Sequence, residues 1–245
     1  MPESQTPFID GEKIPDETFD DIYQPPPGFE PPLLQSHLII GARGSGKTTL
    51  LRHLKRQHEQ RDSGIALHIS LAGVLPEHAR DLGYGSLSFH IPRNQAQLLE
   101  ARTVSFLAIK LSRLLAEKNV PPPTPELRAC LPKSCRQMIE QGKELDWDSL
   151  LSSLSNEPAF SFAGEPAEDN FVSLINELGR RTANTHGPLL LLFDRADQVS
   201  PAALPPIFWL LCQSASYRAV IAMRPGHTGE LLEELVLRNI ITLTY

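Results

Sequence analysis

Residues 41–48 have the types and the spacing of a phosphate-binding loop, because they match the pattern G-x-x-x-x-G-K-S/T. Glycines let the backbone curl so that successive N–H groups point at phosphate oxygens, and the following helix N-terminus adds positive potential. Lys47 is expected to reach the β- and γ-phosphates, and the Thr48 hydroxyl to ligate Mg²⁺. The sequence thus predicts a site for ATP and Mg²⁺. The residues expected to bind the nucleotide are Gly41, Ala42, Arg43, Gly44, Ser45, Gly46, Lys47, Thr48 and Thr49.

The segments on both sides of this loop give the pattern its physical context. Residues 38–40 are an apolar run typical of a buried strand, and an amphipathic helix is expected to begin near Thr49. The alternative is a glycine-rich turn without a ligand. The strand, the lysine, the threonine and the helix in this order favour the binding loop.

A second run that could do chemistry ends in Asp194. Residues 189–193 are all apolar and follow a helix break at 186–188, so they are typical of a buried strand that ends in a carboxylate. We expect a central parallel strand beside the phosphate loop, which would put Asp194 at the Mg²⁺ site. Many buried strands end in a turn-forming aspartate, so the run alone is weak evidence for a metal site. Its position downstream of a phosphate loop makes Asp194 a candidate Mg²⁺ ligand.

Arg224 closes a further apolar strand, residues 218–223. At the carboxyl end of a parallel strand, its side chain would project toward the γ-phosphate. An ordinary strand-end arginine in solvent explains the same sequence equally well.

The remaining pattern alternates strands with helices, which predicts a three-layer α/β/α core with a parallel central sheet and a helical insertion. Residues 1–35 are an acidic, proline-rich arm. Its apolar and aromatic side chains are expected to dock on the core or on a nucleotide base, and simple packing on the core is favoured; they are Phe8, Ile9, Phe19, Ile22 and Tyr23. The core is expected over 36–245, with an insertion over about 119–166 that holds short helices around Trp147. Further strands are expected at 65–71, 87–91 and 239–244, and helices at 95–119, 168–182, 201–214 and 228–237.

Composition narrows the class of protein. The 245 residues are 41% hydrophobic and 21% charged, enough for one α/β domain. The net charge of −6 argues against a nucleic-acid-binding surface, so nucleic acid is expected as an indirect partner only. No C-x-x-C pair is formed by the three cysteines, which are Cys130, Cys135 and Cys212. The sequence also contains neither a signal peptide nor an apolar run long enough to span a membrane. We expect a cytoplasmic protein without a membrane partner.

The loop at 41–49, the segment 190–199 and the strand end at 223–225 together resemble the ATPase core of AAA+ and STAND proteins. The resemblance is strongest to bacterial origin-recognition-complex-like ATPases and NACHT-type signalling ATPases, and covers roughly residues 36–245 without the insertion. It implies that Lys47 is the Walker A lysine, that Thr48 and Asp194 serve Mg²⁺, and that Arg224 senses the γ-phosphate.

The sequence departs from these families in two places. AAA+ proteins usually follow the metal-binding aspartate with a glutamate that activates water, but this chain has Arg195, which cannot accept a proton at neutral pH. In NACHT-like proteins a carboxylate three positions after that aspartate does comparable work, and Asp197 occupies this position as the candidate base. These families also continue into a helical lid after the last core strand, whereas this sequence ends at Tyr245. We expect the lid residues to be missing, supplied by another chain or lost to truncation.

Three classes of function follow from these residues. The first is a slow or partner-dependent Mg-ATP switch in a larger assembly, with a protein partner or a homo-oligomer, in defence or nucleic-acid-associated complexes. The second is a nucleotide-binding structural subunit without turnover, which Arg195 and the missing lid favour. The third is a small-molecule P-loop kinase, disfavoured because no arginine-rich lid segment is found and because the strand that ends in Asp194, the Walker B strand, lies late in the chain.

Overall fold

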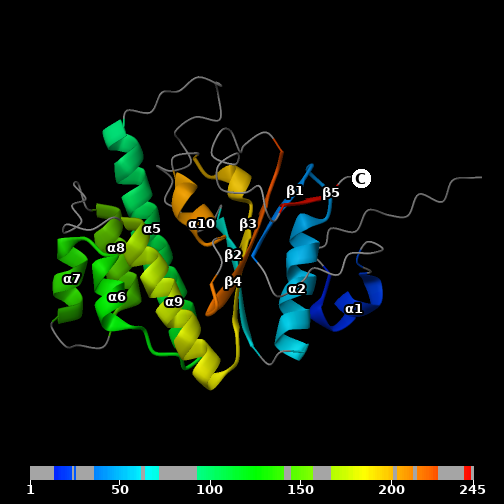
Figure 1. The fold of residues 1–245 in the computed structure, drawn as a ribbon, viewed down its shortest axis with the longest axis horizontal. Helices are drawn as coiled ribbons and strands as arrows, with labels where there is room; N and C mark the ends of the chain where they lie inside the picture. The colour runs from blue at the N-terminus through cyan, green and yellow to red at the C-terminus, as the bar shows by residue number, and fades with distance from the viewer. Residues whose placement is uncertain are drawn as a thin grey trace, which may run out of the picture.

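A computed structural model describes residues 14–23, 25, 36–61, 64–71, 93–140, 145–156, 167–200, 203–211, 214–225 and 240–243. A parallel sheet lies between α2 on one side and α5 to α9 on the other, which confirms the predicted three-layer α/β/α core (Figure 1). None of the described helices is long and apolar enough to cross a bilayer.

The strands are β1 (His37–Gly41), β2 (Ile65–Ser70), β3 (Leu189–Asp194), β4 (Tyr217–Met223) and β5 (Ile240–Leu243). The helices are α1 (Phe19–Ile22), α2 (Lys47–Arg61), α5 (Arg93–Ala116), α6 (Thr124–Ala129), α7 (Lys133–Glu140), α8 (Trp147–Asn156), α9 (Ala167–Thr185) and α10 (Pro205–Trp209), with 3₁₀ turns η1 (Asp16–Thr18) and η2 (Ala196–Gln198).

The strand order corrects one sequence-based expectation. The order is β2-β3-β4-β1-β5, so β4 separates β3 from the strand that leads into the phosphate loop. The strand that ends in Asp194 is therefore not beside β1, as the sequence had suggested. Because all neighbouring pairs are parallel, the carboxyl ends of β1, β3 and β4 still meet at one edge of the sheet.

Alternate residues of the buried strands serve two separate apolar cores. On β3, Leu190 and Leu192 face the core under α2, whereas Leu189, Leu191 and Phe193 belong to the core on the opposite face. Every residue of β3 is buried because helices cover both faces, which explains why its sequence is a continuous apolar run rather than an alternating one.

The helices within residues 119–166 supply buried side chains to the larger core. Leu127, Cys130, Cys135 and Leu150 are all buried there together with residues of α5 and α9. The helix expected at 95–119 runs from Arg93 to Ala116 and ends in a Schellman motif. In that motif the N–H of Val120 donates to Leu115 O at 2.9 Å, and Asn119 takes the left-handed φ of 63°.

The N-terminal arm packs on α2 through Phe19, which is fully buried, as its apolar side chain had suggested. The Arg52 guanidinium lies 4.6 Å from the Phe19 ring centroid, and its Nη2 lies 2.5 Å from Asp16 Oδ1. The hydrogen bond from Arg52 and its charge lower the pKa of Asp16. The Tyr23 ring lies 5.3 Å from Phe19, whereas Ile22 stays 48% exposed.

Other expected elements differ in extent or lie outside the described residues. The helix predicted at 201–214 is the short α10, because Pro205 and Pro206 lack N–H groups and are tolerated only in a first turn. Residues 8, 9, 87–91 and 228–237 lie outside the described part of the chain. The predicted short helix around Trp147 is confirmed as α8, and the helix predicted at 168–182 as α9.

Candidate nucleotide-binding site

The loop between β1 and α2 has the backbone conformation that its glycines allow. Gly44 and Gly46 have φ values of 83° and 79°, in the left-handed region that strains other residues. A Cβ built on Gly46 would meet nothing within 4 Å, so the dihedral angle rather than space requires glycine there. The N–H of Leu50 donates to Gly46 O at 2.8 Å, which starts the helix directly from the loop.

The Lys47 ammonium lies over the loop at the start of α2. Its Nζ donates to Gly41 O at 2.6 Å and to Ala42 O at 2.8 Å, and it lies 3.4 Å from Ser45 Oγ. Burial lowers the pKa of Lys47, the charges of Asp197 and Asp194 oppose that shift, and the charge of Arg224 adds to it. Three of the charged residues singled out from the sequence thus act on the lysine that should contact phosphate.

The Thr48 hydroxyl and the Asp194 carboxylate meet although they are far apart in sequence. Thr48 Oγ1 donates to Asp194 Oδ2 at 2.7 Å, and the carboxylate is almost completely buried. The other oxygen, Oδ1, accepts the N–H of Arg195 at 2.8 Å. Arg195 has a φ of 60°, and this left-handed turn directs its N–H back to the preceding side chain. Asp194 is therefore held from both sides at the edge of the sheet.

The Thr48 and Asp194 oxygens fit the role of a Mg²⁺ site. Mg²⁺ prefers hard oxygen ligands and is usually held by one or two protein groups together with substrate phosphates and waters. A hydroxyl and a carboxylate 2.7 Å apart beside a phosphate-binding loop supply such a partial ligand set. When bound, the ion would neutralise phosphate charge, and these two side chains would orient it.

His68 is a member of this site that the sequence analysis missed. Its Nε2 lies 4.0 Å from Asp194 Oδ2, and it extends from β2, the strand that pairs with β3. The apolar pattern of residues 65–70 predicted a strand, but it could not predict that this strand pairs with β3, which carries Asp194. The available signal was a histidine in the middle of the run, where the neighbours on both sides, Leu67 and Ile69, are apolar.

Arg224 and Asp197 form an ion pair at the same edge of the sheet. Arg224 follows β4, and its Nε lies 3.1 Å from Oδ2 of Asp197, which is part of η2 after β3. The Asp197 side chain is 5% exposed and that of Arg224 is 38% exposed. The structure thus pairs Arg224 with another residue that the sequence singled out, and its role toward the γ-phosphate stays a prediction.

The rest of the loop is more open. Ala42, Arg43 and Gly44 are exposed, and Thr49 is partly buried in the first turn of α2. The structure thus brings the loop, the expected metal ligands, Asp197 and Arg224 to one edge of the sheet.

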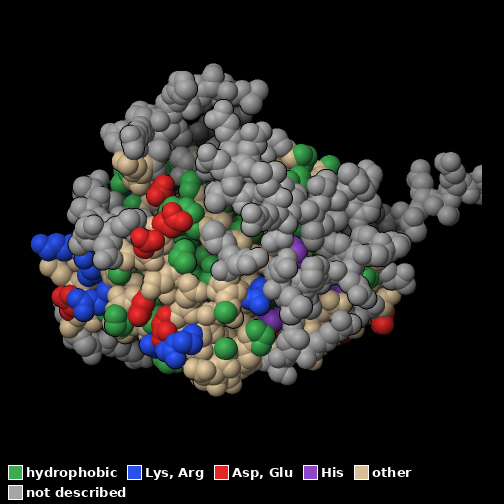
Figure 2. Space-filling view, in the orientation of Figure 1, with side chains coloured by type: hydrophobic (Ala, Val, Ile, Leu, Met, Phe, Trp, Pro, Cys, Tyr) green, Lys and Arg blue, Asp and Glu red, His purple; other side chains and the backbone are tan. Residues whose placement is uncertain are grey.

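The helical layer presents a surface of mixed charge. On the face seen in Figure 2, acidic and basic side chains lie side by side over the helices. The ion pairs on this layer include Arg128 with Glu140 and Arg113 with Asp148. These described residues balance each other in sign, and therefore they do not form a basic patch.

Comparison with known proteins identifies the family of the chain. The family model described as the AAA ATPase domain matches residues 17–221, which includes the loop, Asp194, Asp197 and most of β4. A search of curated proteins finds no match to the chain. The family model covers more than half of the chain, and the fold and the site are consistent with it. This protein therefore belongs to the AAA ATPase domain family and is a nucleotide-binding P-loop ATPase module.

Proposed function

We propose that this chain is a Mg-ATP switch that hydrolyses ATP slowly, or only with a partner, and acts within a larger cytoplasmic assembly. The hydrogen bond between Thr48 and Asp194 carries the proposal, because it joins the phosphate loop to the strand-end carboxylate where Mg²⁺ would bridge them. Lys47, with its ammonium in the same loop, supplies the charge for the β- and γ-phosphates.

Slow turnover is expected from the two positions at which the related families carry a catalytic base. Arg195 stands where a glutamate base is usual, and its guanidinium cannot take a proton at neutral pH. The remaining candidate base, Asp197, is buried and paired with Arg224. A switch of this kind would change state mainly when ATP binds and when a partner adjusts the site.

The setting of the switch is inferred from sequence resemblance. The similarity to origin-recognition-complex-like and NACHT-type ATPases favours a defence or nucleic-acid-associated assembly, in which a protein partner or further copies of the chain complete the site. Nucleic acid would then contact that assembly rather than this chain, whose net charge is −6.

The alternative function is a structural subunit that holds ATP without hydrolysing it. The ion pair between Asp197 and Arg224 favours it, because it occupies the only candidate base that the motif offers. The two functions share the binding site and differ in turnover alone.

Phosphate release from three proteins separates these functions. At saturating ATP and Mg²⁺ we expect slow release by the wild type and a gain in Arg195→Glu, since general-base catalysis commonly contributes about 10²–10⁴-fold. Arg195→Gln is the matched control, because it removes the same positive charge without adding a base. Equal rates in the glutamate and glutamine variants would contradict the proposed position of the base, and fast wild-type turnover would contradict a slow switch.

A further inference from the structure

His68 extends from the face of the sheet that α2 covers. On β2, Leu67 and Ile69 belong to the large core on the other face, and side chains alternate along a strand, so the histidine between them points toward the α2 side. The Asp194 carboxylate is on that side too, because it accepts a hydrogen bond from Thr48 of α2. β2 and β3 are paired neighbours in the sheet (Figure 1). A histidine, a carboxylate and a hydroxyl thus gather on one face from three separate elements.

One oxygen of Asp194 faces both of the other groups. Oδ2 accepts from the Thr48 hydroxyl at 2.7 Å and lies 4.0 Å from Nε2 of His68, while Oδ1 accepts the N–H of Arg195. The ligands of one octahedral ion, each about 2.0–2.1 Å from it, are roughly 3 Å apart when adjacent and roughly 4 Å apart when opposite. The two separations around Oδ2 are close to these values.

The His68 ring would change which ion suits this site. Mg²⁺ prefers oxygen ligands alone, whereas Co²⁺ and other first-row transition ions also bind a neutral imidazole nitrogen well. The His68 side chain is 28% exposed, so the ring is not closed off by the core.

The protein groups alone are a weak metal site. Among the residues that the structure describes, no three His, Cys, Asp or Glu side chains are grouped so as to hold a metal ion. The set at the sheet edge has one carboxylate, one imidazole and one hydroxyl, and the phosphate oxygens of a bound nucleotide would have to supply further ligands. The ion is therefore expected to bind together with ATP.

We infer that His68 is a third protein ligand of the metal ion at the nucleotide site, and that its nitrogen raises the affinity for Co²⁺ and Mn²⁺ relative to Mg²⁺. Asp194 and Thr48 supply the oxygen ligands beside it. This inference rests on the ATP-binding function proposed above, and it concerns which ion accompanies the nucleotide.

Calorimetric titrations of ATP in the presence of Co²⁺ or Mg²⁺ test the preference. We expect His68→Ala to lower the ratio of the affinity with Co²⁺ to that with Mg²⁺ by roughly tenfold, the scale on which changes around a metal centre usually alter metal affinity. His68→Asn should lower the ratio as well, because its amide oxygen favours Mg²⁺ over Co²⁺. The matched control is His186→Ala, which removes a histidine before β3, at the opposite end of that strand from Asp194, and should leave the ratio unchanged. Circular dichroism checks that each variant folds.

Pulsed EPR of the protein with Mn²⁺ and ATP detects the ligand directly. Protein labelled with ¹⁵N in histidine alone should show a ¹⁵N hyperfine coupling to the ion, which the ¹⁴N of adenine cannot produce, and the coupling should be absent from His68→Ala and His68→Asn. A wild type that binds ATP but shows no ¹⁵N coupling, or an affinity ratio unchanged in both His68 variants, would overturn the inference. A wild type that binds ATP with none of these ions would instead overturn the proposed function.

Discussion

The two faces of the sheet are built for different tasks. On one face, α2 covers a small core that includes Leu50, Leu51 and Leu54, and this helix begins in the phosphate loop. On the other face, α5 and α9 cover the large core, and α6 to α8 extend it outward (Figure 1). The expected site residues come from the first turn of α2 and from strand ends, whereas the large core is apolar scaffold.

This difference makes stability and nucleotide binding separable. Substitutions in the large core should lower the free energy of unfolding and leave the affinity of the folded protein unchanged. Substitutions at the sheet edge should do the reverse, because their side chains contact ligand rather than the packed interior. Variants on both faces of the sheet test that separation.

Phe171→Ala should have the largest effect. Phe171 is fully buried in the large core, and removal of such a side chain costs about 3–5 kcal/mol of unfolding free energy. Urea denaturation measures it, with Ser173→Ala, an exposed position on the same helix, as the control expected within about 0.5 kcal/mol. A weakened ATP affinity of the folded Phe171→Ala protein would break the separation of the two faces.

Phe19→Ala tests whether the N-terminal arm belongs to the α2 side of the fold. The ring is fully buried against Arg52, so we expect a loss of about 3 kcal/mol in unfolding free energy. Ile22→Ala removes a side chain of the same short helix that is 48% exposed, and it should cost less than about 1 kcal/mol. Equal losses in the two variants would mean that the arm is not anchored through Phe19.

Asp194→Asn should alter binding without altering the fold. If Thr48 and Asp194 share Mg²⁺, loss of the carboxylate charge should reduce the benefit of Mg²⁺ to ATP affinity by about 1–3 kcal/mol. Titrations with and without Mg²⁺ measure that benefit, and circular dichroism checks the fold. A Mg²⁺ dependence equal to that of the wild type would place Asp194 outside the site.

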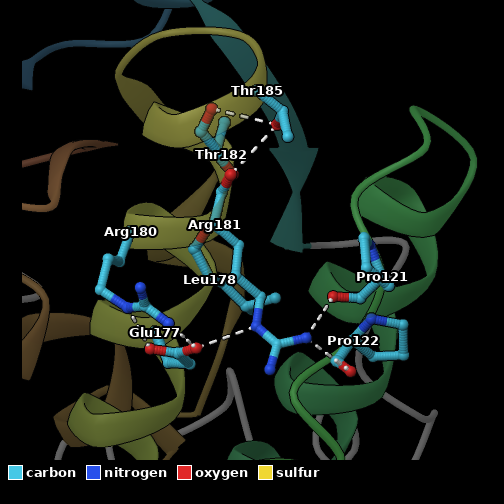
Figure 3. A network of polar contacts seen from close by, with 8 residues as sticks. All are labelled: Pro121, Pro122, Glu177, Leu178, Arg180, Arg181, Thr182 and Thr185. Atoms are coloured by element: carbon cyan, nitrogen blue, oxygen red, sulfur yellow. Dashed lines mark hydrogen bonds and ion pairs between the residues drawn. The ribbon is translucent and has the colours of Figure 1, made fainter.

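Glu177→Gln should have the smallest effect, and that effect should depend on pH. Hydrogen bonds from Arg180 and Arg181 lower the pKa of Glu177 to about 2, and Arg181 also donates to Pro121 O and Pro122 O, which ties α9 to the segment before α6 (Figure 3). Because the folded pKa lies below the unfolded one, this stabilisation is complete above about pH 4.5 and is lost as the pH falls toward 2.

Urea denaturation of the wild type and Glu177→Gln at several pH values tests this linkage. The difference should be about 1 kcal/mol or less at pH 7, since Arg180 is exposed, and it should shrink toward zero near pH 2. A difference that stays constant down to pH 2 would contradict the lowered pKa.

The sequence was sufficient to predict the parts of the molecule that are local in the chain. The loop at 41–48 specifies its backbone through glycines, and the short apolar run before Asp194 is typical of a strand buried on both faces, as the structure shows. Helices α5 and α9 followed from their periodic apolar residues, with ends displaced by only a few positions.

Features that depend on which strands are neighbours could not be predicted. Periodicity reveals which face of a strand is buried but not the order of strands in the sheet, so the position of β4 between β1 and β3 was missed. The contact of His68 with Asp194 and the ion pair of Arg224 with Asp197 both depend on that order. Helices α6 and α7 have only six and eight residues, and their stability comes from tertiary packing.

The loop at the edge of the sheet should bind Mg-ATP through Lys47, and calorimetry measures that binding. Wild-type protein should bind ATP in the presence of Mg²⁺, and Lys47→Ala should lose about 1–3 kcal/mol of binding free energy, the scale of a charge-assisted contact. Lys55→Ala is the matched control, because Lys55 lies on the same helix and points to Glu59 rather than to the loop. Equal ATP affinity in the wild type and both variants would contradict the assignment of this site.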